Sequence, residues 1–226
     1  MKTYPQYILV LASTLLATAR AQDQPATVSG SAPPEASKTI SDENIEKEWS
    51  GSVSAYTYFV PDGRDYVQPT VAFDRKWLHL EARYNYENLE TGSTWVGYNF
   101  SGGEKLSWEF TPMFGGIFGE TTGVAPGYKG SLSWWKLELY SEGEYVIDLH
   151  DSSENFFYNW SELTLAPADW FRFGLVTQRT RAYQTDRDIQ RGLLVGFSIK
   201  ELALTTYLFN LDEEKPTFVF SVAINF

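Results

Sequence analysis

The sequence contains no cysteine and only 2 histidines among its 226 residues. Without thiols the chain cannot form disulfides, and it lacks the nucleophile and thiolate ligands that many enzymes and structural zinc sites use. So few histidines argue against a structural metal site, and no glycine-rich phosphate loop follows a strand into a helix. The sequence therefore predicts no metal site and identifies no cofactor.

Excess positive charge and long hydrophobic runs are also missing. The formal net charge is -11, which argues against a nucleic-acid partner because phosphate contacts need basic residues. Mean hydropathy is -0.30, although aromatic residues make up 16% of the chain. Many aromatic side chains with low mean hydropathy indicate strands that alternate apolar and polar residues, rather than membrane-spanning helices.

The first residues have the three-part layout of a secretory signal peptide. Lys2 is followed by an apolar run over residues 7–19, and an Ala-Arg-Ala cleavage site ends at residue 21. The run is shorter than the roughly 20 residues that a membrane-spanning helix needs. Residues 1–21 are therefore predicted to be a cleaved signal peptide. Residues 22–48 are rich in Pro, Ser, Ala and acidic residues, which predicts a disordered periplasmic tail.

From residue 49 onward the sequence alternates between apolar and polar residues with a period of two. This pattern predicts an all-β fold over residues 49–226, a single antiparallel transmembrane β-barrel of about 12 strands, with about 10 or about 14 as alternatives. In the last strand the apolar face, suited to lipid, holds Phe218, Phe220, Val222, Ile224 and Phe226. The predicted strands cover residues 50–60, 66–73, 77–87, 94–101, 105–117, 128–140, 145–152, 156–166, 170–181, 189–199, 202–210 and 217–226.

The connections between the predicted strands alternate in length. Joins after even-numbered strands are tight turns, whereas most of the others are longer, as at the periplasmic and outer rims of outer-membrane barrels. Residues 141–144 are assigned to a tight turn and residues 118–127 to a longer loop. Trp77 and Trp170 follow tight turns, where an interfacial aromatic girdle is expected.

The leader, the alternating strands and the C-terminal Phe-Ser-Val-Ala-Ile-Asn-Phe resemble those of bacterial outer-membrane β-barrel proteins. The resemblance covers the chain after about residue 49 and is to the class as a whole. It implies a Gram-negative-type envelope and a location in the outer membrane, in contact with lipids that include lipopolysaccharide. It also implies that the barrel-assembly machinery reads the terminal Phe226.

Ionisable side chains of both signs gather on the predicted inward face. A barrel of about 12 strands encloses a narrow lumen, so these side chains are expected to meet across it. They would form either a charged constriction that selects small hydrophilic solutes or a salt-bridged plug that closes the barrel. The predicted lumen residues are His79, Glu81, Arg83, Glu87, Glu109, Lys136, Glu138, Asp148, Glu162 and Arg172.

His150 and Ser152 offer a catalytic alternative, because residues two apart on a strand point the same way. The pair resembles the His-x-Ser pairing of outer-membrane phospholipase A, and Asn155 or Asn159 could orient the imidazole. Two features depart from that family: the Asn-Gly after the serine is absent, and strand parity turns the pair inward, away from lipid. We therefore rank a lipid hydrolase below the channel and the closed barrel, neither of which needs a catalytic residue.

Basic residues gather in the segment 172–191. Arg179, Arg181 and Arg187 fall near a predicted outer loop, where they would pair with lipopolysaccharide phosphates or with nearby acidic residues.

Three functions remain, and the sequence ranks first a small outer-membrane channel for hydrophilic solutes. A non-conducting barrel, structural or interacting with the envelope, is second and the hydrolase third.

Overall fold

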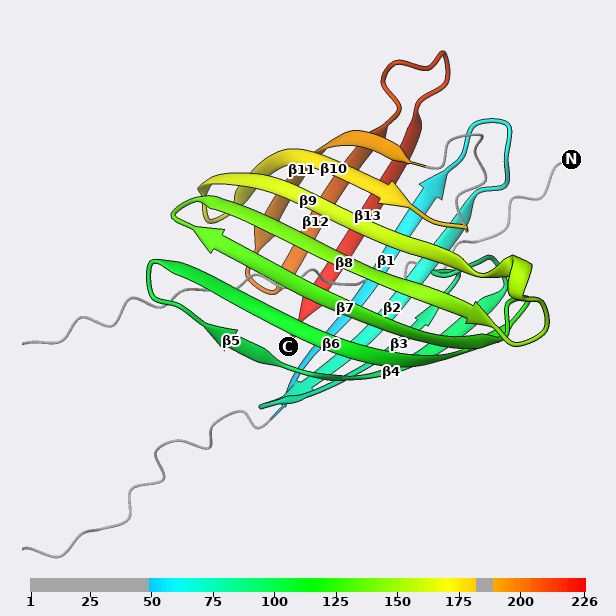
Figure 1. Ribbon diagram of the computed structural model, residues 1–226. Coiled ribbons are helices and arrows are strands. Elements are labelled where there is room, and N and C mark those ends of the chain that lie inside the picture. The colour runs from blue at the N-terminus through cyan, green and yellow to red at the C-terminus, as the bar shows by residue number, and fades with distance from the viewer. Residues whose placement is uncertain (1–48, 182–188) are drawn as a thin grey trace, which may run out of the picture.

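The computed structural model describes residues 49–181 and 189–226, so the predicted signal peptide, the predicted tail and Arg187 lie outside the described residues. Figure 1 shows a wall of long strands. None of the described residues belongs to a helix long and apolar enough to cross a bilayer. The elements are β1 (Ser50–Phe59), β2 (Tyr66–Arg75), β3 (Leu78–Tyr84), β4 (Thr91–Tyr98), β5 (Phe100–Gly102), β6 (Leu106–Gly119), β7 (Gly123–Trp134), β8 (Leu137–Asp148), the 3-10 helix η1 (Ser152–Glu154), β9 (Phe156–Ala168), β10 (Phe171–Arg179), β11 (Gln190–Ile199), β12 (Leu202–Phe209) and β13 (Thr217–Asn225).

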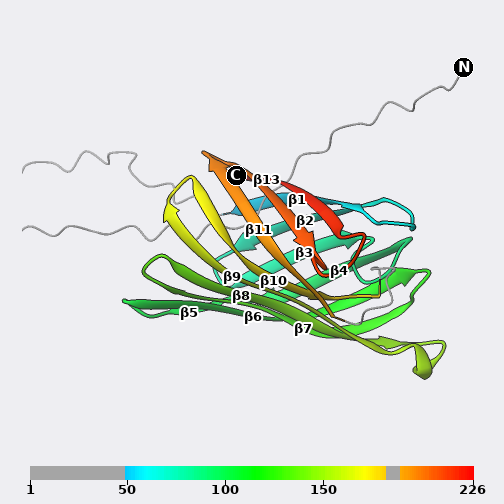
Figure 2. The same ribbon diagram turned by 90° about the horizontal axis from the view of Figure 1, so that it is seen from above.

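The strands close into one antiparallel barrel. Apart from β4 and β5, consecutive strands pair with each other, β1 pairs with β13, and β4 closes the ring by pairing with β6. β5 continues β4 beyond Asn99 and also pairs with β6, so the wall is 12 strands around. The break at Asn99 lies near Pro112 on β6, which has no N–H to donate to the ladder. Figure 2 shows β1–β3 and β13 on one side and β6–β8 on the other. The predicted all-β fold, a single antiparallel barrel of 12 strands, is confirmed.

The two rims of the barrel differ. At the rim where β1 begins and β13 ends, which we call the turn rim, the connections are residues 76–77, 103–105, 135–136, 169–170 and 200–201. At the opposite rim, the loop rim, the connections are residues 60–65, 85–90, 120–122, 149–155, 180–189 and 210–216. The predicted asymmetry between short turns and longer loops is therefore confirmed, with residues 120–122 as a short exception.

The predicted turn at residues 141–144 and most of the predicted loop at residues 118–127 are wrong. Residues 141–144 lie inside β8, and β7 already begins at Gly123. The turn between these strands consists of Trp135 and Lys136 instead. Trp135 adopts a φ of 55°, a left-handed conformation that usually marks Gly or Asn, so the sequence gives no turn signal there.

Glycines within β7 and β8 led to the wrong turn and loop predictions, and close packing against aromatic rings explains why they are there. A Cβ on Gly127 would lie 3.0 Å from the Trp95 ring, and one on Gly143 would lie 2.9 Å from the Tyr128 ring. These glycines make room for neighbouring rings within strands, although Gly in sequence usually signals a turn.

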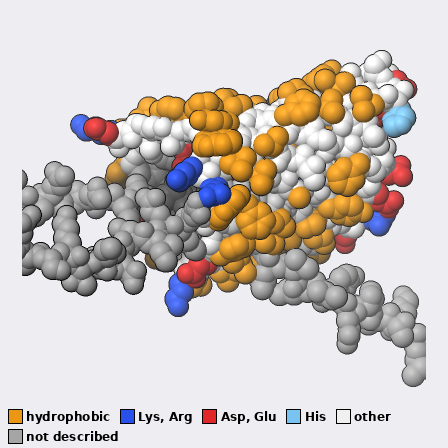
Figure 3. Space-filling model, turned by 90° about the horizontal axis from the view of Figure 1, so that it is seen from below, with side chains coloured by type: hydrophobic (Ala, Val, Ile, Leu, Met, Phe, Trp, Pro, Cys, Tyr) orange, Lys and Arg blue, Asp and Glu red, His pale blue; other side chains and the backbone are white. Residues whose placement is uncertain are grey.

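Large apolar side chains cover the outside of the barrel. Figure 3 shows hydrophobic side chains over much of the visible wall, with charged side chains mostly toward its ends. In β13, Phe218 is exposed whereas Thr217 and Val219 are buried inside, as the alternation predicts. Beyond β13, Phe226 donates to and accepts from the backbone of Gly51 over 2.9 and 2.8 Å, which extends the seam between the first and last strands.

Candidate functional site

Side chains fill the half of the interior next to the loop rim, which we call the loop half. The rings of Tyr58 and Tyr66 stack with centroids 4.5 Å apart, and Gln178 donates to the Tyr58 hydroxyl over 3.0 Å. This bond joins β1 to β10, which are not neighbours in the wall. Each wall strand supplies an inward residue no more than 7% exposed: Tyr58, Tyr66, Arg83, Thr91, Ile117, Ala125, Val146, Tyr158, Gln178, Gln190, Tyr207 and Val219.

A buried charged network surrounds Arg83 beside these rings. The guanidinium donates to Glu81 through Nε and to Glu144 through Nη1, the latter over 2.7 Å. It also lies 4.1 Å from the ring centroid of Tyr86 and 4.6 Å from that of Trp95, within the range of cation–π attraction. Arg83 therefore links β3 to β8 across the interior.

Further groups extend this network toward the pocket described below. Lys129 donates to Glu81 and lies 3.7 Å from Glu142. Glu142 accepts from the hydroxyls of Tyr86 and Tyr140, the second over 2.7 Å. Carboxylates thus outnumber the basic groups that neutralise them.

Glu87 joins the network from the loop after β3. Its carboxyl accepts from Ser93 over 2.5 Å and lies 3.8 Å from Arg83. Burial raises the pKa of the Glu87 carboxyl above its ordinary value, because the ionised form loses its hydration. One oxygen of Glu87 and one of Glu144 are buried without a hydrogen-bond partner in the described part of the chain.

His79 carries the network toward the turn rim. Its Nδ1 lies 2.8 Å from Asp74, and its Nε2 lies 3.0 Å from Glu81. Asn99 donates to the same Asp74 oxygen over 2.7 Å and accepts from Thr111 over 2.7 Å. Side-chain hydrogen bonds therefore bridge the wall where β4 is interrupted.

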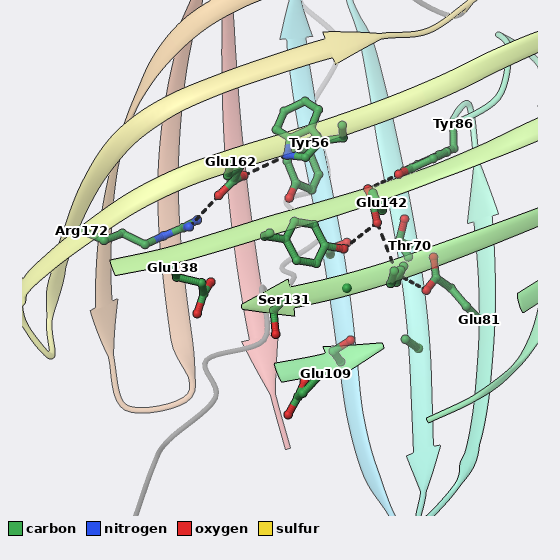
Figure 4. Close-up of a pocket in the computed structure, with 17 residues that line it drawn as sticks. Tyr56, Thr70, Glu81, Tyr86, Glu109, Ser131, Glu138, Glu142, Glu162 and Arg172 are labelled. Atoms are coloured by element: carbon green, nitrogen blue, oxygen red, sulfur yellow. Dashed lines mark hydrogen bonds and ion pairs between the residues drawn. The ribbon is translucent and has the colours of Figure 1, made fainter. Parts of the chain in front are cut away.

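The half of the interior next to the turn rim, the turn half, contains a pocket of about 150 Å³ (Figure 4). This is room for several water molecules or for a small organic molecule. Glu109 is exposed whereas Glu81 and Trp160 are buried, so the pocket opens toward the turn rim. Its lining is Ser52, Ser54, Tyr56, Thr70, Ala72, Glu81, Tyr86, Glu109, Lys129, Gly130, Ser131, Glu138, Tyr140, Glu142, Trp160, Glu162 and Arg172.

Arg172 and Glu162 form the ordered polar centre of the pocket. Arg172 donates to Glu162 over 2.7 Å and to Thr205 over 3.2 Å. Glu162 also accepts from the Trp160 indole over 3.0 Å and from the Tyr207 hydroxyl over 2.9 Å. The carboxylate is thus held between the pocket and the packed loop half.

The mouth of the pocket carries unneutralised negative charge. Lys129 and Arg172 are the basic residues of the lining, and both already contact carboxylates. Glu109 and Glu138, nearer the turn rim, have no basic partner within 4.0 Å among the described residues, although Glu138 accepts from Ser133 over 3.3 Å. A cation entering from this side would meet these two carboxylates first. No group of three or more His, Asp or Glu in the described ranges could hold a metal ion.

Seven of the predicted lumen residues in the wall strands lie in the network or the pocket, namely His79, Glu81, Arg83, Glu109, Glu138, Glu162 and Arg172. Lys136 lies instead in the turn between β7 and β8, where it donates to the Pro167 carbonyl over 2.5 Å. Asp148 ends β8 at the loop rim and accepts from the backbone of His150 over 2.7 Å. Lys136 and Asp148 therefore lie at opposite rims.

The proposed catalytic pair lies in the loop between β8 and β9. The His150 side chain is 77% exposed, and its Nδ1 lies 3.9 Å from Asp148. Ser152 begins η1 and is exposed. Within the described part of the chain no hydrogen bond joins His150 to Ser152. Nearby, Arg181 pairs with Glu154 and donates to its carbonyl oxygen over 2.6 Å.

Sequence reasoning missed Lys129, Glu142 and Glu144. Glu142 and Glu144 fell in the wrongly assigned turn, yet the alternation that starts at Glu138 continues through both of them. The inward tyrosines were also missed, because only charged side chains were considered for the inward face. Continuing the strand parity through residues 141–144 would have found both carboxylates.

No protein-family model matches the chain, and no curated protein matches it.

Proposed function

We propose that the chain is a non-conducting outer-membrane β-barrel, which binds small hydrophilic cations in a pocket open at the turn rim. Its outer wall supports the membrane location: Phe114, Leu175 and Phe197 point outward and are 53%, 56% and 45% exposed. Apolar surface as extensive as this suits contact with lipid rather than water. The layout of residues 1–21 and the apolar face of β13 agree with export to an outer membrane.

The main support for a non-conducting barrel is that inward side chains fill the loop half. In the described part of the chain, inward side chains no more than 7% exposed form a ring that fills this half of the lumen. A hydrated ion could pass only if packed tyrosines and the Arg83 network moved apart. The charged lining of the pocket agrees with a channel, the function that the sequence ranked first. A conducting pore, however, must also be open at the loop rim.

The pocket supports a preference for cations. Its lining holds five carboxylates but only two basic residues. Tyr56, Tyr140 and Trp160 add aromatic faces, which attract organic cations through cation–π contacts. A small ammonium compound therefore fits the charge and the aromatic lining of the pocket better than an anion of equal volume.

Two envelope partners follow from the proposed location. Phe226, exposed at the end of the last strand, is the residue that we propose the barrel-assembly machinery reads. Arg179 and Arg191 lie on the outward face near the loop rim, where headgroup phosphates of lipopolysaccharide would lie.

Solute efflux from vesicles tests this function. Vesicles containing the refolded wild-type protein should release a trapped pentose no faster than protein-free vesicles. A triple variant, Tyr58→Ala/Tyr158→Ala/Tyr207→Ala, opens the loop half and should accelerate release. The matched control, Trp77→Ala/Trp135→Ala/Trp170→Ala, removes rings at the turn rim and should leave release unchanged. Fast release by the wild type would overturn the proposal.

A further inference from the structure

The loop between β3 and β4, residues 85–90, turns back into the lumen, and we call it the inner loop. Its Tyr86 and Glu87 are buried, although the loop lies at the rim of the barrel. The Tyr86 ring packs on the Tyr158 ring with centroids 4.7 Å apart, and Leu89 packs against the same aromatic cluster. The inner loop is therefore part of the packing that fills the loop half.

The carboxyls of Glu87 and Glu144 meet at one nitrogen of Arg83. Arg83 Nη1 lies 3.8 Å from Glu87 Oε1 and 2.7 Å from Glu144 Oε2. The second oxygen of each carboxyl, Glu87 Oε2 and Glu144 Oε1, is buried and has no hydrogen-bond partner among the described residues. Leaving buried acceptors unsatisfied costs free energy. A proton on one carboxyl gives it a donor for the other, so one shared proton satisfies both.

The surroundings of the two carboxyls also favour a bound proton. Ser93 on β4 donates to Glu87 over 2.5 Å and is uncharged. Figure 4 shows Tyr86 pointing at Glu142, a further carboxylate of this network. Carboxylates outnumber the basic residues here, and a shared proton reduces that excess of negative charge. The titratable and charged side chains that face the two carboxyls are Glu81, Arg83, Tyr86, Lys129, Glu142 and Tyr158.

We propose that a proton shared by Glu87 and Glu144 holds the inner loop inside the lumen, and that the loop half opens when this proton is lost at high pH. Two ionised carboxylates repel each other, and each needs water. Glu144 lies within β8, whereas Glu87 lies in a loop, so Glu87 is the group that can move away. Its movement takes Tyr86 off Tyr158 and admits water to the Arg83 network. The inference rests on the closed loop half proposed above and adds its regulation.

The direction of the pH effect follows from burial. Burial raises the pKa of the Glu87 carboxyl above its ordinary value, because the ionised form loses its hydration. The folded chain therefore keeps the proton to a higher pH than an ordinary carboxyl does, and the closed form is favoured at low pH. Loss of one proton can raise the ratio of open to closed chains by up to about tenfold per pH unit.

Efflux of a trapped pentose from vesicles at pH 5 and pH 9 tests the proposal. Both values lie below the range in which tyrosine and lysine ordinarily titrate. Wild-type protein should release the pentose as slowly as protein-free vesicles at pH 5, and roughly tenfold faster or more at pH 9. Glu87→Gln and Glu144→Gln carry an amide N–H in place of the proton and should stay slow at pH 9. Glu90→Gln removes an exposed carboxylate from the same loop and should respond as wild type does.

A thiol probe follows the inner loop itself. The chain has no cysteine, so Leu89→Cys reports on the loop alone. Ser152→Cys, exposed in η1, corrects for the greater reactivity of thiols at high pH. The ratio of labelling rates, Leu89→Cys over Ser152→Cys, should rise from pH 5 to pH 9, and adding Glu87→Gln should abolish the rise.

The outcomes separate this regulation from the closed barrel. Slow wild-type release at both pH values, or a labelling ratio that stays constant, would overturn the shared proton and leave the closed loop half intact. A rise in release that survives Glu87→Gln and Glu144→Gln would assign the response to another group, such as His79, and would also overturn it. Fast wild-type release already at pH 5 would contradict the closed loop half itself.

Discussion

The loop half and the turn half of the barrel interior are built on the same strands but hold different side chains. On β1 the loop half receives Tyr58, whereas the turn half receives Ser52 and Ser54. On β9 the corresponding residues are Tyr158, buried among rings, and Glu162, which lines the pocket. The number of strands sets the diameter of the barrel, but the size of the inward side chains determines whether the lumen is filled. Four changes test this contrast.

The largest expected difference in stability is between variants that remove one arginine from each half. Arg83→Ala leaves several buried carboxylates without their cation, and should lower the free energy of unfolding by about 5 kcal/mol. Arg172→Ala, in the more open turn half, should lower it by only about 2 kcal/mol. Denaturant unfolding of the vesicle-embedded proteins measures both values. Equal losses would break the contrast between the halves.

Replacing one tyrosine in each half should again cost more free energy of unfolding in the loop half, but the difference between the two losses should be smaller. Tyr158 is 1% exposed and packs on Tyr86 with centroids 4.7 Å apart, so Tyr158→Ala creates a cavity and should cost about 3–4 kcal/mol. Tyr140 borders the pocket, where space already exists, and Tyr140→Ala should cost about 2 kcal/mol. The same unfolding measurement compares them, and a costlier Tyr140→Ala would contradict the account.

The seam at the turn rim should be sensitive to a single side chain. A Cβ on Gly51 would lie 2.5 Å from the Phe226 ring, so Gly51→Val should displace this ring and cost about 1–3 kcal/mol. Gly116 has open space around its Cβ position, and Gly116→Val is the control, expected to change stability by less than about 0.5 kcal/mol. Heat-modifiable gel mobility of both variants shows whether the barrel still closes.

A pH effect should appear in the loop half. Because burial raises the pKa of Glu87 in the folded protein, the folded state holds its proton more tightly than the unfolded state. The stability linked to this group is therefore greatest below the ordinary carboxyl pKa, and falls as the pH rises through the folded-state pKa. Glu87→Gln should make the fall in the thermal midpoint between pH 5 and pH 8 shallower, whereas an unchanged profile would contradict this assignment.

The sequence predicted the wall better than the interior. Alternation on β13 placed Phe218 and Phe226 outward correctly, because every second residue of a strand must face the same side. The β7–β8 turn could not be predicted, since Trp135 takes a conformation that its residue type rarely adopts.

The candidate site followed from the sequence only in part. Parity places Glu81 and Arg83 on one inward face, but no local pattern shows that Arg83 reaches Glu144 on β8. Contacts of this kind depend on how the sheet closes. They also determine whether inward charges line a pore or plug it, so a list of inward charges did not distinguish these two outcomes.

Planar-bilayer recording of the refolded wild-type protein tests the closed loop half most directly. If the loop half is closed, the wild type should show no discrete conductance steps, and the Tyr58→Ala/Tyr158→Ala/Tyr207→Ala variant should show them. Discrete steps in the wild type that change with Glu109→Ala or Arg172→Ala would contradict the closed barrel and show that the charged pocket lines a pore.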